Sequence, residues 1–128
     1  MRRFLAFIAV GLLLLSGRFY ANGLSRYADY GDYMVFTNAD AQTQYDGGLV
    51  RGYDRLELYD ANSLEEILDG LGAVLLFTER AENVTIWYYD SSVLTKSVRV
   101  NGKRVKIAVA INQSGDVTVG APIIKGSY

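Results

Sequence analysis

The Asn-Gly pair at positions 101 and 102 constrains the fold more than any other feature of the sequence. Asn and Gly tolerate the positive φ angles that both central residues of a two-residue hairpin turn require. With strands over 97–100 and 103–111, this turn sets Arg99 opposite Arg104 and Val98 opposite Val105, and a slip of one residue would mix apolar with charged side chains. We expect a helix on the apolar face, which consists of Val98, Val100, Val105, Ile107, Val109 and Ile111.

One helix is predicted from Ser63 onward. Ser63 and Glu66 have the spacing of a capping box, in which each side chain bonds a free backbone N–H at the start of a helix. Gly70 and Gly72 then end the helix. Apolar residues follow the cap at a spacing of three and four, which places them on one helical face. These residues are Leu64, Ile67, Leu68 and Leu71.

Strand signals surround this helix, and the fold class that they indicate is α+β. Alternating or β-branched segments bounded by turn residues are typical of strands. We expect an antiparallel sheet of five or six strands, a C-terminal meander, with one main helix packed on one face. Pro122 has no N–H to donate and so belongs near an edge or a strand end. The predicted strands are 34–36, 49–59, 73–79, 83–90, 97–100, 103–111 and 117–124.

The beginning of the chain has the pattern of an export signal. Two arginines precede an apolar run of 12 residues, Phe4–Leu15. A membrane-spanning helix needs about 20 residues, whereas the apolar part of a secretory signal has about 7–15. We predict that residues 1–21 are a signal peptide or an uncleaved N-terminal anchor, and that the protein is extracellular or at the cell surface. Residues 22–48 would form a linker and a short strand, and 49–128 a single domain.

Composition excludes several classes of function. The chain has no His and no Cys, so it cannot build Cys–His dyads, Ser–His–Asp triads or the usual zinc sites. We predict no catalytic residue, no metal and no cofactor. Three of the 13 Lys and Arg precede residue 22, which leaves 10 against 14 acids and argues against a nucleic-acid partner. Membrane contact is expected only through the N-terminal segment, if that segment is uncleaved.

Trp87 and Tyr89 are the first candidate binding residues. On the predicted strand 83–90 they share one face with Thr85, while Val84, Ile86 and Tyr88 share the other. If the second set meets the helix, Trp87 and Tyr89 point away from it. There they either cover the opposite face of the sheet or form a stacking surface for a sugar ring or a peptide.

Arg99, Arg104 and Lys106 are the second set of candidate binding residues. Together with Lys96 and Lys103 they fall within residues 96–106, a segment without an acid. Like charges directly opposite each other on paired strands repel, and an anion would relieve that repulsion. The alternative is a solvated face balanced by the acidic residues of 21–70. The expected partner is an envelope protein or an anionic cell-wall polymer.

Two further possibilities concern catalysis and strand pairing. Asp54 with Glu57, or Asp29 with Asp32, could form the carboxylate pair that glycosidases use, which would make the protein a cell-wall glycan hydrolase. The last predicted strand, 117–124, is a candidate for pairing with a partner chain by edge addition.

The second half of the chain resembles the YwmB-like family, small exported proteins of Gram-positive bacteria. The resemblance rests on an aromatic strand and loop at 87–91, an Asn-Gly-Lys strand at 101–108, and a closing Val-Gly-x-Pro-Ile-Ile segment at 119–124. It implies an α+β fold like that of the TATA-box-binding protein by shape alone. It implies neither an established activity nor DNA binding.

Overall fold

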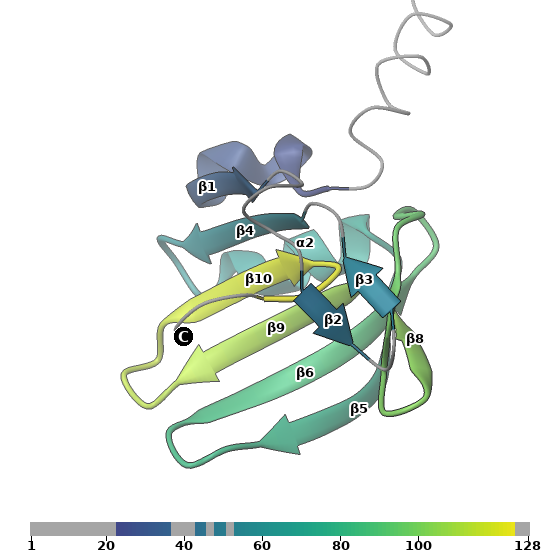
Figure 1. Cartoon of the computed structure of the whole chain (residues 1–128). Coiled ribbons are helices and arrows are strands. Elements are labelled where there is room, and N and C mark those ends of the chain that lie inside the picture. The colour runs from purple at the N-terminus through teal and green to yellow at the C-terminus, as the bar shows by residue number, and fades with distance from the viewer. Residues whose placement is uncertain (1–22, 37–42, 46–47, 51–52, 125–128) are drawn as a thin grey trace, which may run out of the picture.

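The centre of the protein is a six-stranded antiparallel sheet (Figure 1). The computed structural model describes residues 23–36, 43–45, 48–50 and 53–124. The strand order is β1-β4-β10-β9-β6-β5, and this mostly antiparallel architecture with few helices fits the α+β class. The strands are β1 (Gly31–Phe36), β4 (Tyr53–Leu58), β5 (Ala73–Arg80), β6 (Val84–Ser91), β9 (Ile107–Asn112) and β10 (Val117–Ala121).

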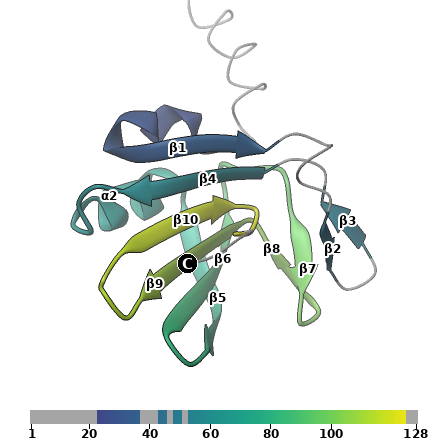
Figure 2. The same ribbon diagram turned by 60° about the vertical axis from the view of Figure 1, so that its left-hand side comes forward.

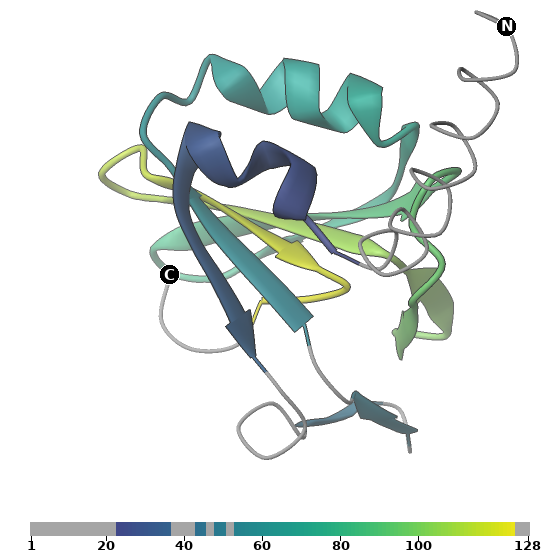
Figure 3. The same ribbon diagram turned by 90° about the horizontal axis from the view of Figure 1, so that it is seen from above.

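Two helices and two small hairpins accompany the sheet. The 3-10 helix η1 (Ser25–Tyr30) and the α-helix α2 (Ser63–Gly70) lie together on one side of it (Figure 3). The hairpin of β7 (Val98–Val100) and β8 (Lys103–Val105) stands beside the hairpin of β2 (Thr43–Tyr45) and β3 (Gly48–Val50), as Figure 2 shows. The chain crosses from β4 through α2 to β5 at the far edge, and then returns through β6, β9 and β10 to pair with β4.

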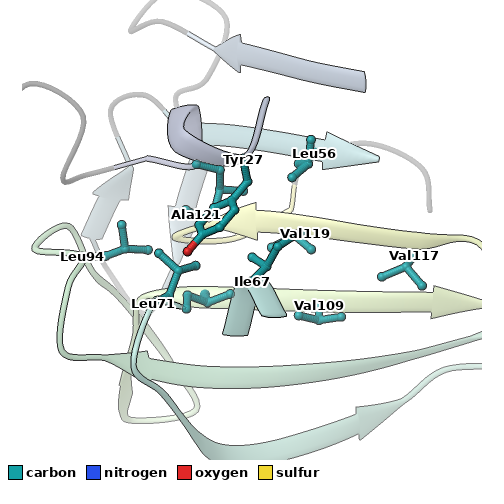
Figure 4. Close-up of a cluster of buried hydrophobic side chains, with 11 residues drawn as sticks. Tyr27, Leu56, Ile67, Leu71, Leu94, Val109, Val117, Val119 and Ala121 are labelled. Carbon is teal, nitrogen blue, oxygen red and sulfur yellow. The ribbon is translucent and has the colours of Figure 1, made fainter. Parts of the chain in front are cut away.

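Helix α2 attaches to the sheet through the apolar stripe that the sequence predicts. Ile67 and Leu71 are fully buried (Figure 4). Leu64 and Leu68 are partly buried and pack against the same cluster. The rest of this helix-side cluster comes from the sheet, from η1 and the residue before it, and from the segment between β6 and β7. Its buried members are Leu24, Tyr27, Leu56, Leu94, Ile107, Val109, Val117, Val119 and Ala121.

The predicted capping box is wrong. The helix begins at Ser63, but its N-cap residue is Asn62 and no side chain caps it. Asn62 has helical φ and ψ angles, and its N–H donates to the Asp60 carboxylate at 2.9 Å, so the chain is already turning before Ser63. Glu66 instead accepts a hydrogen bond from the Tyr30 hydroxyl at 3.0 Å. That bond raises the pKa of Tyr30 and joins the two helices.

The segment before β4 contributes more structure than its polar composition suggests. Residues 23–36 supply η1 and the edge strand β1, which pairs with β4. The Asp54 carboxylate accepts the Leu24 N–H at 2.6 Å and the Tyr33 hydroxyl at 2.7 Å. Because a buried charge is tolerated only when it is hydrogen-bonded, these two bonds explain why Asp54 can lie inside the fold.

The apolar residues around the Asn-Gly turn do not all face the helix, as the sequence suggests they should. Val98, Val100 and Val105 belong to a second cluster on the opposite face of the sheet, whereas Ile107 and Val109 face the helix. The cause is a break at residue 106, where the expected strand 103–111 divides into β8, which pairs with β7, and β9, which pairs with β6. The sheet is therefore covered on both faces.

The last strand is not an edge strand. β10 pairs with β4 on one side and with β9 on the other, so it offers no free backbone for a partner chain. Pro122 follows the last residue of β10, which confirms the expected strand end. Within the described part of the chain, the edges of the large sheet are β1 and β5.

Truncation of Ile67 tests the attachment of α2. Because this side chain is fully buried, Ile67→Ala is expected to lower the free energy of unfolding by about 2–5 kcal/mol. Exposed Glu65 on the same helix is the matched control, and Glu65→Ala is expected to change it by less than about 0.5 kcal/mol. Urea unfolding followed by circular dichroism measures both free energies. Equal losses of stability in the two variants would contradict the packing of Ile67 against the sheet.

Candidate functional site

The β7–β8 hairpin has the register that the sequence predicts. Arg99 lies opposite Arg104, Val98 opposite Val105, and Val100 opposite Lys103. Asn101 and Gly102 have φ angles of 50° and 76°, which confirms the turn. The three valines are buried, and the hairpin is thus held to the second face of the sheet by one of its own faces.

The other face of the hairpin presents two arginines to solvent. Arg99 and Arg104 share this face and are exposed, and we call these two residues the cationic face. Lys103 is also exposed, but it lies opposite Val100 beside the turn, on the valine side of the hairpin. The two ion pairs found among the described residues, Arg55–Glu57 and Lys106–Asp90, include none of them. In a two-residue hairpin the pair next to the turn exchanges both hydrogen bonds, so Arg99 and Arg104 occupy the following, non-hydrogen-bonded position, where side chains are closest.

Lys96 and Lys106 lie apart from the cationic face. The Lys106 ammonium is 3.4 Å from an Asp90 carboxylate oxygen and donates to the Ser91 carbonyl at 3.0 Å, so it secures the end of β6. Lys96 is partly buried in the segment before β7. Burial lowers the pKa of Lys96, and the charge of Asp54 opposes that shift. Of the five cations in 96–106, three are therefore exposed, and two of them, Arg99 and Arg104, share one face of the hairpin.

The expected orientation of Trp87 and Tyr89 is wrong. Both pack partly buried against the helix-side cluster, while Ile86 and Tyr88 belong to the cluster on the opposite face. Strand register explains this, because Trp87 lies opposite Val109 in β9, and Val109 faces the helix. Trp87 thus packs inside the fold, and burial raises the pKa of Tyr89.

The two carboxylate pairs differ in how the structure arranges them. Asp54 and Glu57 lie on opposite faces of β4: Asp54 is bonded to Leu24 on the helix side, and Glu57 is paired with Arg55 on the other. They therefore cannot flank one glycosidic bond, as a hydrolase requires. In the second pair, Asp32 accepts the Tyr59 hydroxyl at 2.9 Å.

A polar depression of about 390 Å³ lies over the ends of β1, β4 and β10. Its charged groups are satisfied by one another: both Arg55 Nε and Nη2 donate to Glu57, Tyr59 donates to Asp32, and the Asn112 amide donates to Asp116 at 3.3 Å. Because these groups already bond one another, we interpret them as a network that supports the structure and not as a ligand site.

Comparison with known proteins identifies no relative of this chain: no protein family, curated protein or solved structure matches it. The resemblance to the YwmB-like family stays a prediction. In the part of the chain that the structure describes, no helix is long and apolar enough to cross a membrane. The apolar run Phe4–Leu15 lies outside the described residues.

Truncation of Trp87 separates its two interpretations. Because the ring packs against the helix-side cluster, Trp87→Ala is expected to lower the free energy of unfolding by about 2–4 kcal/mol. Tyr59 is 73 % exposed, so Tyr59→Ala is the matched aromatic control and should change it by less than about 1 kcal/mol. Thermal unfolding measures both. If the Trp87 variant is as stable as the unmodified protein, the ring does not serve packing, and a role in stacking against a ligand is favoured.

Proposed function

We propose that this protein is an exported, non-catalytic component of the cell envelope that binds an anionic envelope polymer through the cationic face of its hairpin. The observation that carries the proposal is the direct opposition of two exposed arginines, Arg99 and Arg104, on a hairpin whose other face is buried. The resemblance of the second half of the chain to a family of exported proteins also supports a location in the cell envelope.

The arginine pair suits an anion for a physical reason. Two like charges directly opposite each other destabilise a strand pair by a few tenths to about 1 kcal/mol. A phosphate or carboxylate placed between them removes that repulsion and gains charge-assisted hydrogen bonds, since each guanidinium offers a planar fork of donors. Lys103 adds a third positive charge next to the turn.

The anchoring of the hairpin makes this arrangement rigid. Val98, Val100 and Val105 are buried in one cluster with Tyr53, so the arginines project from a fixed backbone. A binding surface that is already ordered loses less conformational entropy when its ligand arrives. The overall charge of the chain is slightly negative, at −1, so binding depends on the local cluster and not on bulk charge.

Replacing both arginines tests the binding. Arg99→Gln with Arg104→Gln is expected to reduce retention on a purified phosphate-rich cell-wall fraction about tenfold at low salt, because two charge-assisted contacts are lost. The folded state should be unchanged or slightly more stable, since the repulsion is gone. Co-sedimentation with the wall fraction over a salt series measures retention.

The matched control uses two exposed arginines on other elements, Arg26 in η1 and Arg80 in β5. Arg26→Gln with Arg80→Gln removes the same charge from the molecule and should retain most of the binding. Equal losses in the two double variants would show that only net charge matters and would refute the hairpin as the site.

The predicted export has its own test. The protein carrying a C-terminal tag, expressed in a Gram-positive host, is expected in the medium or in the membrane fraction, because its basic start and apolar run match a secretory signal. Mass spectrometry of the recovered product shows whether the first residues have been removed. Recovery of the uncut chain from the soluble cytosol would contradict export.

A further inference from the structure

Edge strand β5 exposes apolar side chains beside unpaired backbone. Val74 and Leu75 are 63 % and 52 % exposed. Among the described strands β5 pairs only with β6, so alternate N–H and C=O groups along it point outward. The pairing shifts register between Leu75 and Phe77, and Glu79 and Arg80 follow. The bulge and the charges discourage pairing along the second half of the strand, which leaves Ala73–Leu75 open.

A groove runs alongside this open stretch, between α2 and β5. Its volume is about 520 Å³. Leu64 and Leu68 from the helix and Leu75 from the strand give it apolar walls, and partly buried Tyr89 from β6 also lines it.

The rim of the groove is acidic. Glu65 and Asp69 line it from α2, and both are exposed. They are four residues apart, a spacing at which like charges on a helix repel. Neither takes part in the ion pairs found within the described residues. A cation held between them would therefore be stabilising.

We propose that the open half of β5 and the α2–β5 groove bind an extended peptide segment of a partner protein, with one large apolar residue flanked two positions away by Lys or Arg. The backbone of the segment would pair with Ala73–Leu75 as an added strand. Every second side chain then points toward α2. The apolar one enters the groove against Leu75, and the cations reach Glu65 and Asp69.

Charge favours this occupant over a second copy of the chain. Antiparallel pairing of two β5 strands would continue the sheet and bring the two α2 helices to the same face. The acidic rims, Glu65 and Asp69 of each copy, would then approach one another, and such like-charge contacts disfavour association. The site is on the opposite face of the sheet from the anchored side of the hairpin and does not depend on the anion binding proposed above.

A labelled peptide tests the proposal directly. The probe is a fluorescein-tagged peptide with the sequence Gly-Thr-Lys-Thr-Leu-Thr-Lys-Thr-Gly, titrated with the purified protein expressed from the full sequence. Saturable fluorescence anisotropy is expected, together with backbone amide shifts along Ala73–Leu75 in NMR spectra. Peptides with Glu in place of Lys, or Ser in place of Leu, should bind about tenfold more weakly or not at all.

Variants of the protein locate the binding. Leu75→Lys is expected to weaken binding about tenfold, and Glu65→Gln with Asp69→Asn about threefold, with a smaller salt dependence. Val35→Lys is the matched control, because Val35 is 58 % exposed on the other edge strand, β1. Glu82→Gln with Asp29→Asn removes two exposed acids elsewhere. Both controls should bind like the unmodified protein.

Three outcomes would overturn the proposal. The first is the absence of saturable binding by a protein whose circular dichroism shows that it is folded. The second is an equal effect of Leu75→Lys and Val35→Lys. The third is a concentration-dependent dimer in sedimentation velocity that Leu75→Lys dissociates, which would assign the edge to a second copy of the chain.

Discussion

Close packing against both faces of the central strands is the constraint on which the rest of the structure depends. On the helix side, β9 and β10 present Val109 and Val119, which meet α2. On the other side they present Ala108, Ala110 and Gly120. A Cβ atom at Gly120 would collide with the Ile123 carbonyl, so only glycine lets Ile123 and Ile124 pack over this face of the sheet. Small residues on one face thus make room for a second layer.

That second layer gives the cationic hairpin its position. Ile123 and Ile124 join Val98, Val100 and Val105 in the cluster on this face. The valines hold one face of the hairpin in place, and strand alternation then directs Arg99 and Arg104 outward. The buried valines thus complete the packing on this face of the sheet and also fix the two arginines that we propose bind an anion.

Two clusters of opposite charge lie on the two sides of the sheet. Ten of the 14 acidic residues fall within residues 21–70, and Glu65 and Asp69 lie on the helix side, beside the open part of β5. The exposed cations of the hairpin belong to the layer on the opposite face. The two proposals therefore concern two chemically different surfaces, one for a polyanion and one for a cationic peptide segment, on opposite sides of the sheet.

Local patterns in the sequence determined the individual turns, strand pairs and helix of this protein. The positive φ angles of Asn101 and Gly102, the opposition of Arg99 and Arg104, and the apolar face of α2 follow from turn chemistry and from side-chain period, which act over a few residues. Tertiary structure alone decided on which face of the central sheet each of these elements packs. The break at Lys106, the inward turn of Trp87, the central place of β10 and the open edge of β5 arise from contacts between distant segments, and a period of two along a strand cannot tell one face of a sheet from the other.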